Sequence, residues 1–188
     1  AIAGTPTPTL DLPMRRLSAT ANWSRLWLAV GGAMALVGGR TGRRAATAGI
    51  VALAVDSAVV NIGLKIAARR RRPDRDSAGV PANRRVPMPG STSFPSGHTA
   101  SGFAFTNAVA HTLPAAAGPL GLLASAVGYS RVHTGVHYPG DVVIGAVIGT
   151  AVGEAVGWAT RRPQARPRFR LKRALLASSA SSGMWDEL

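Results

Sequence analysis

The stretch Val142–Thr160, VVIGAVIGTAVGEAVGWAT, contains a single charged residue, Glu154. An apolar helix of this length is long enough to cross most of the roughly 30 Å hydrocarbon core of a membrane. One face of it carries a glycine at every fourth position: Gly145, Gly149, Gly153 and Gly157. A face without side chains lets another helix approach closely. The stretch therefore predicts a membrane span that packs through its glycines.

Four more apolar windows precede this one: Leu26–Gly39, Ala45–Leu64, Gly97–Ala117 and Leu120–Val132. The second and third of these have the length of a span, whereas the first and fourth are short. Hydrophobic residues make up 46% of the chain and charged residues only 16%, with a mean hydropathy of +0.14. These values argue against an ordinary soluble domain. The sequence predicts an all-α integral membrane bundle of about five to six spans.

The apolar region divides the 188 residues into three parts. We expect residues 1–24 to form an N-terminal surface segment, residues 25–160 the membrane domain, and residues 161–188 a basic, flexible cytoplasmic tail. Within the first part, either Asp11–Ala21 forms a surface helix in place of a first span, or the bundle is abbreviated. The net charge of +14 lies mostly in the flanks of the windows. Cysteine is absent, which excludes disulfides, thiolate metal sites and a cysteine nucleophile.

Several residues at the edges and inside the windows carry further expectations. Trp23, Trp27 and Trp158 lie at window edges, where an amphipathic ring prefers the headgroup region. Asp56 and Glu154 lie inside apolar windows, so both are expected to face the bundle interior or a polar cavity. A structural hydrogen bond is the expected role of each carboxylate.

Three polar clusters interrupt the pattern, each at the edge of a window. They read K-x6-R-P from Lys65, P-S-G-H from Pro95, and S-R-x5-H-x3-D from Ser130 to Asp141. Spans that alternate in direction place these window edges on the same side of the membrane. The sequence thus predicts that the three clusters meet at one end of the bundle.

Most residue types in the clusters suit phosphate binding. Lys65, Arg72 and Arg131 supply positive charge, and an arginine can hold two phosphate oxygens through its planar fork. Ser96 offers a hydroxyl, and Gly97 permits close backbone approach where a helix begins. Together they predict a phosphate-binding site.

The two histidines of the clusters, His98 and His137, suit phosphoryl transfer. A neutral imidazole can attack phosphorus, and a protonated one can give its proton to the leaving oxygen. Asp141 follows His137 by four residues and can fix the tautomer of its ring or cap the next helix. His111 and His133 belong to no cluster and are not expected to take part in the chemistry.

On these residues the sequence resembles the type 2 phosphatidic acid phosphatase superfamily, whose three-part signature is present at every position. The resemblance implies a haloperoxidase-like helical bundle and metal-independent dephosphorylation through a phosphohistidine, without a cofactor. It implies that His137 is the nucleophile, Asp141 its orienting partner and His98 the general acid. The phosphate-binding residues implied are Lys65, Arg72, Ser96, Gly97 and Arg131.

The expected substrate is a phospholipid or isoprenoid phosphate, either phosphatidic-acid-like or an isoprenyl pyrophosphate such as undecaprenyl pyrophosphate. Basic residues are split almost evenly between the two sides of the membrane. We place the Arg40–Arg44 loop and the tail in the cytoplasm, so the site of this multi-pass cell-membrane protein faces outward. That orientation is usual for the family in bacteria, which the compact Ala/Arg/Gly-rich chain suggests as its source.

Three alternatives stay open. A lipid-linked phosphotransferase would pass the phosphoryl group from the same histidine to an acceptor other than water. A noncatalytic basic membrane protein would bind anionic lipid or nucleic acid through charge alone, although no nucleic-acid partner is expected. A soluble phosphatase would have to bury the apolar windows. The sequence does not fix whether the chain forms a homodimer or carries a further domain.

Overall fold

The computed structural model describes residues 2–161, and every regular element in this range is a helix. The α-helices are α1 (Pro8–Thr20), α2 (Arg25–Val37), α3 (Gly39–Ser57), α4 (Lys65–Ala68), α5 (Gly97–Ala110), α6 (Ala117–His133) and α7 (Pro139–Thr160). Shorter helical turns are η1 (Ile2–Gly4), η2 (Asn22–Ser24), η3 (Ala58–Leu64), η4 (Ala82–Arg84) and η5 (Pro114–Ala116). Apart from Arg161, the predicted basic tail lies outside the described residues.

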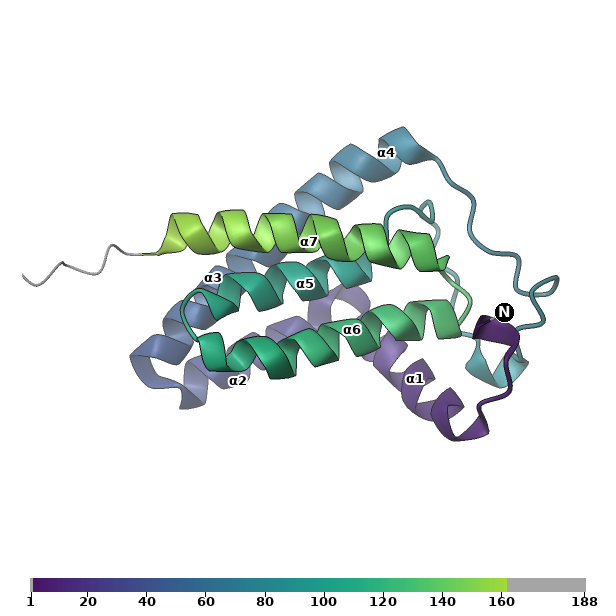
Figure 1. The fold of residues 1–188 in the computed structure, drawn as a ribbon, viewed down its shortest axis with the longest axis horizontal. Coiled ribbons are helices and arrows are strands. Elements are labelled where there is room, and N and C mark those ends of the chain that lie inside the picture. The colour runs from purple at the N-terminus through teal and green to yellow at the C-terminus, as the bar shows by residue number, and fades with distance from the viewer. Residues whose placement is uncertain (1, 162–188) are drawn as a thin grey trace, which may run out of the picture.

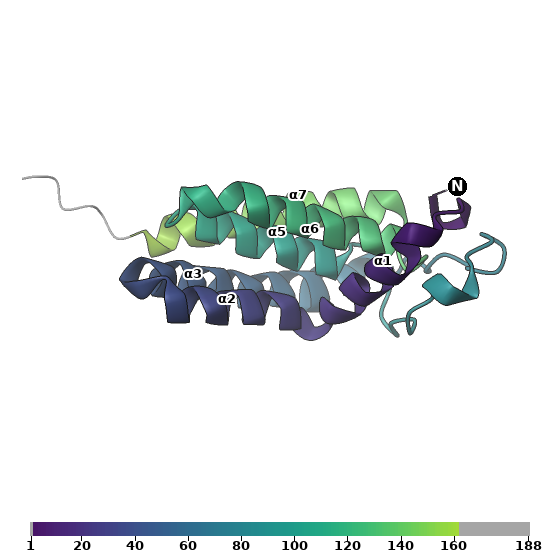
Figure 2. The same ribbon diagram turned by 90° about the horizontal axis from the view of Figure 1, so that it is seen from below.

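The long helices form two layers, which Figures 1 and 2 show from two sides. One layer holds α5, α6 and α7, and the other holds α2 and α3 (Figure 2). Helix α5 is the centre of the bundle, since it contacts α3, α6 and α7. The short helix α1 lies at an angle across one end and contacts α6 (Figure 1).

Two helices in the described part of the chain are long and apolar enough to cross a membrane. One is the continuous helix Gly39–Ala68, made of α3, the π-helical η3 and α4, and the other is Pro139–Thr160. They have 30 and 22 residues, with mean hydropathies of 1.8 and 1.7 over their best windows. Large apolar side chains on the outside of the bundle are well exposed, including Leu36, Ile62, Leu122 and Val147. Such an exterior suits contact with lipid better than with water.

The glycine face of α7 packs on α5, as predicted. A Cβ at Gly153 would lie 2.5 Å from the carbonyl oxygen of Ala104, and one at Gly149 would clash with the backbone of Ala100. The backbone of α5 therefore leaves no room for a side chain at these two positions of α7. This close approach brings the first turns of α5 and α7 together, where the P-S-G-H and H-x3-D segments lie.

The predicted window Gly97–Ala117 is wrong at its C-terminal end. Helix α5 stops at Ala110, and α6 begins at Ala117, three residues before the predicted window. Pro114 explains the break, because it has no N–H to donate and it restricts the residue before it. Leu113 is accordingly non-helical, with φ −133° and ψ 77°.

Two expectations about window residues are also wrong. Trp27 is only 1% exposed and packs on Phe105 with 5.5 Å between ring centroids, so it belongs to the core and not to the interface. Glu154 does not face the interior: its side chain is 54% exposed and pairs with His111 at 2.8 Å. Asp56 is buried as predicted.

The N-terminal segment and the long polar connection are joined by charges. Helix α1 confirms the expected helix near Asp11–Ala21, and its 13 residues are too few to span a membrane. Asp11 pairs with the buried Arg84 at 2.6 Å, which ties α1 to η4. The connection between α4 and α5 is further fixed by Arg75, which donates to the carbonyl oxygen of Val86 at 2.8 Å.

Candidate active site

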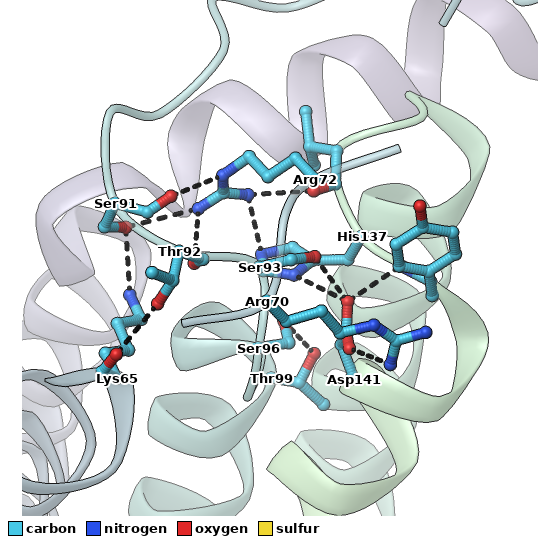
Figure 3. A network of polar contacts seen from close by, with 12 residues as sticks. Lys65, Arg70, Arg72, Ser91, Thr92, Ser93, Ser96, Thr99, His137 and Asp141 are labelled. Carbon is cyan, nitrogen blue, oxygen red and sulfur yellow. Dashed lines mark hydrogen bonds and ion pairs between the residues drawn. The ribbon is translucent and has the colours of Figure 1, made fainter. Parts of the chain in front are cut away.

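The three sequence clusters meet at one end of the bundle, as predicted. The end of the α3–α4 helix, the start of α5, the end of α6 and the start of α7 all lie there, covered by the polar connection (Figure 1). Figure 3 shows a network of polar contacts that runs through this end from Lys65 to Asp141. The site is therefore assembled from four helix ends that are remote in sequence.

His137 lies in the tight turn between α6 and α7. Gly135, with φ +67°, provides the left-handed backbone conformation that the turn needs, and Pro139 starts α7. Nδ1 of His137 faces Oδ2 of Asp141 at 3.6 Å, and both side chains are almost fully buried. This distance exceeds that of a good hydrogen bond but permits strong electrostatic attraction. The turn thus fixes a histidine against a carboxylate.

The carboxylate of Asp141 is held by groups from three segments. Ser93 Oγ donates to Oδ2 at 2.5 Å, and the backbone N–H of Tyr138 donates to the same oxygen at 2.9 Å. Arg70 Nη1 donates to Oδ1 at 2.9 Å (Figure 3). The guanidinium of Arg70 also lies over the ring of Tyr138, 4.3 Å from its centroid. These donors stabilise the ionised form and fix its orientation.

Arg72 contacts the opposite nitrogen of the His137 ring. Its Nη1 lies 3.3 Å from Nε2 of His137 and 2.8 Å from the carbonyl oxygen of Val136. Its Nε donates to the carbonyl oxygen of Ser91 at 2.8 Å. An arginine only donates, so Nε2 must be the acceptor in this contact. The proton of the neutral ring then lies on Nδ1, toward Asp141, and Nε2 carries the lone pair.

Burial lowers the pKa of His137 from its ordinary value of 6.5 to about 4. Asp141 opposes this shift, whereas the positive charges of Arg72 and Arg131 add to it. The ring is therefore neutral at physiological pH. Burial also lowers the pKa of Arg72, but a guanidinium keeps its charge in proteins.

Three more residues of the first two clusters, Lys65, Ser96 and Gly97, make contacts at this end of the bundle. Lys65 Nζ donates to Ser91 Oγ at 3.3 Å, and a Cβ at Gly97 would lie 3.5 Å from the same nitrogen. Ser96 is fully buried, and its hydroxyl bonds that of Thr99 at 2.9 Å. Its N–H donates to the carbonyl oxygen of Asp141. Ser96 thus joins α5 to α7 in this structure, rather than presenting a free hydroxyl.

Comparison with known families identifies the fold. The family model described as the PAP2 superfamily matches residues 45–164, which include all three clusters. The chain belongs to the PAP2 superfamily. This confirms the family predicted from the signature, and with it the all-α bundle.

Two solved structures resemble this PAP2 protein over most of its length. One is a transmembrane PAP2 type phosphatidylglycerolphosphate phosphatase from Bacillus subtilis. It is 23% identical, with a TM-score of 0.66, and the match covers 88% of this chain and 84% of that one. LpxE of Aquifex aeolicus is 26% identical, also with a TM-score of 0.66, covering 82% and 89%. No protein among the curated sequences matches the chain.

Arg131 of the PAP2 signature is tied to α1. It is 1% exposed, and its Nη1 donates to the hydroxyl and carbonyl oxygens of Ser18 at 2.6 and 3.1 Å. Its charge still acts on the site, because it contributes to the lowered pKa of His137. Helix α1 lies outside the matched family region, so sequence reasoning had no motif to indicate this contact.

His98 of the signature lines a cavity of about 540 Å³. Its Nε2 lies 2.9 Å from Oδ1 of Asn22, in the η2 turn. Trp23 and Ser24, which follow, both have φ of 55°, a strained value for residues other than glycine. The strained turn holds Asn22 against the histidine.

Sequence reasoning missed three residues of this PAP2 site: Asn22, Arg70 and Ser93. Arg70 belongs to the run Arg69–Arg72, in which the signature singles out only Arg72. Ser93 lies two residues before the P-S-G-H cluster, a position that the signature leaves free. Of the histidines outside the signature, His133 is fully buried and bonds Thr7 Oγ1 at 2.9 Å. It lies in the interface with the N-terminal segment.

Proposed function

We propose that this PAP2 protein is a membrane lipid phosphatase that works through a phosphohistidine on His137. The observation that carries the proposal is the fixed ring of His137, with Nδ1 toward Asp141 and Nε2 toward Arg72. This arrangement supports a nucleophilic role for Nε2 of His137, which is uncharged and lies beside the positive side chain of Arg72. A noncatalytic basic protein has no need of such an arrangement.

The reaction takes two displacements at phosphorus. Nε2 of His137 attacks, and the bond between phosphorus and the leaving oxygen breaks while His98 gives that oxygen a proton. Asp141 stabilises the positive charge that develops on the His137 ring. Water then attacks the phosphohistidine, its proton passes to His98, and inorganic phosphate leaves.

The proposed phosphate-binding residues divide into two groups by their present contacts. Lys65 and Arg72 bond mainly to the Ser91–Thr92 segment. A phosphate that enters would exchange these neutral acceptors for charged oxygens, which bind cations more strongly. Arg131 would act by its charge, while Ser96 and Gly97 position the first turn of α5, whose N–H groups favour an anion.

The proposed location is the cell membrane, with several spans and the site on the extracytoplasmic face. The two long apolar helices and the exposed apolar exterior support membrane insertion. The proposed substrates are the phosphate monoester or pyrophosphate of a lipid, either phosphatidic-acid-like or isoprenoid. The neighbour that acts on phosphatidylglycerolphosphate supports a lipid substrate.

Phosphate release by the detergent-purified protein, in excess EDTA, tests the proposal. The substrates are phosphatidic acid and an isoprenyl pyrophosphate, each with wild type and His137→Ala. We expect release that survives EDTA and disappears in the variant. Loss of phosphate release in EDTA contradicts the metal-independent mechanism. Transfer of the phosphoryl group to an added alcohol, in place of water, indicates a phosphotransferase. Folded protein without release favours the lipid-binding alternative.

A further inference from the structure

A second hollow lies at the end of the bundle opposite the candidate active site. Its volume is about 1100 Å³, and it is lined by the first turns of α3, the residues after α5 and the last turn of α7. These helix ends lie together in Figure 1, remote from α4 and the polar connection. No residue of the three sequence clusters is part of the wall. We call this hollow the remote groove; its wall includes Arg43, Arg44, His111, Trp158 and Arg161.

The arginines of the remote groove have no acidic partner. Arg43 and Arg44 of α3 and Arg161 after α7 are exposed, and none of them forms an ion pair within residues 2–161. The first turn of α3 contains no acidic residue. Glu154 of α7 pairs with His111 instead and is not part of the wall. Like charges that line one hollow repel, and a bound anion relieves this repulsion.

The groove adjoins surfaces that suit lipid. Trp158 is part of its wall and is 76% exposed, and an exposed indole of this kind is typical of the membrane interface. On α3, the helical spacing places Val51 and Val55 on the same face as Arg44. Both valines are exposed. This face therefore offers apolar contact to an acyl chain whose headgroup lies at the arginines.

We propose that the remote groove binds the phosphodiester headgroup of an anionic phospholipid, with an acyl chain along Val51 and Val55. The ligand is a membrane lipid rather than a free phosphate ion, because the arginine and the valines share one face of α3. A headgroup held by Arg44 and Arg161 joins the start of α3 to the end of α7. The site goes beyond the proposed function, since it lies away from the reacting residues and turns over no substrate.

The first experiment measures lipid binding to the detergent-purified full chain through tryptophan emission. Bromine atoms on an acyl chain quench a nearby indole, and Trp158 lies in the groove wall. We expect brominated phosphatidylglycerol to quench at a concentration about tenfold or more below that of brominated phosphatidylcholine, because only the first carries a net charge. Millimolar inorganic phosphate should not restore the emission. In Trp158→Phe the difference between the lipids should disappear, which separates the groove from Trp23 in the cavity beside His98.

The second experiment assigns the binding to the arginines. A double variant with Arg44→Gln and Arg161→Gln should need about tenfold or more phosphatidylglycerol for half of the quenching. The matched control carries Arg16→Gln and Arg40→Gln, which remove the same charge from exposed arginines outside the wall. It should stay within about twofold of wild type, because exposed charges outside the groove are screened by salt. Melting temperatures without added lipid show that both variants fold.

The outcomes test the groove separately from the proposed function. Equal titrations with the two brominated lipids overturn the proposal. Equal losses of affinity in the two double variants also overturn it, since they indicate general attraction by the net charge of +14. Displacement of the lipid by millimolar phosphate assigns the groove to a free anion and overturns the lipid assignment. Neither experiment measures phosphate release, so the phosphatase function stands or fails independently.

Discussion

Arg72 Nη1 lies 3.3 Å from Nε2 of His137, on the ring nitrogen that faces away from Asp141. In the proposed reaction this contact is exchanged when a phosphate arrives. A phosphate oxygen is a better acceptor than an imidazole nitrogen, so we expect the guanidinium to transfer its donors to the substrate. The nitrogen released in this way would be the one that attacks phosphorus.

Replacement of His137 tests the nucleophile directly. His137→Gln keeps a polar side chain of similar size but cannot form a stable phosphoryl intermediate, so kcat should fall by about a thousandfold or more. Phosphate release and the thermal unfolding temperature in detergent measure activity and folding separately. Residual activity within tenfold of wild type would assign the nucleophile to another residue.

The pKa of His137 predicts how stability depends on pH. The folded value of about 4 lies below the 6.5 of the unfolded chain, so the unfolded chain binds this proton first as the pH falls. The contribution to the free energy of unfolding is present above pH 6.5 and is lost progressively down to pH 4, up to about 3 kcal/mol. Melting temperatures at pH 7 and pH 4.5 should therefore differ more for wild type than for His137→Gln. Equal differences would show that the ring is not held neutral.

Arg70 and Arg69 form a matched pair for testing the support of Asp141. Arg70 pairs with the buried carboxylate, whereas no ion pair of Arg69 is found within residues 2–161. Arg70 is half exposed, so its loss should lower stability by no more than about 1 kcal/mol. Arg70→Ala should lower kcat about tenfold, because Asp141 loses a positioning donor, and Arg69→Ala should stay within twofold of wild type. Equal losses in the two variants would indicate a general charge effect.

Asn22 is expected to position His98. Asn22→Ala removes the acceptor 2.9 Å from Nε2 and should lower kcat by about ten- to a hundredfold with little change in KM. Asn22→Asp keeps an oxygen in place and adds a charge that favours the protonated ring. It should restore most of kcat and move the alkaline limb of the pH–rate profile upward. If Asn22→Ala and Asn22→Asp have the same pH–rate profile, Asn22 has only a structural role in the η2 turn.

The sequence predicted the convergence of the clusters because alternating helices leave little freedom in where their ends emerge. The sequence could not predict which residues the charged and polar side chains of the site contact. The contact of Arg131 with Ser18 and that of His98 with Asn22 involve the N-terminal segment, which carries no motif. The interface position predicted for Trp27 was wrong for a similar reason. A position at the edge of an apolar window indicates depth in the membrane. It does not indicate which face of the helix packs on the neighbouring helix, where Trp27 contacts Phe105.

The glycine face of α7 allows a last, purely structural prediction. A Cβ at Gly149 would clash with the carbonyl oxygen of Ala100, and backbone cannot move aside as a flexible side chain does. Gly149→Ala should therefore destabilise the protein by about 1–3 kcal/mol, visible as a lower melting temperature in detergent. Gly121→Ala in α6 is the control, since no neighbouring residue other than those next to it in the helix lies within 4 Å of its added Cβ. Alanine there should be neutral or slightly stabilising, because it is the better helix former. Equal melting temperatures for the two variants would mean that α5 and α7 do not pack as closely as described.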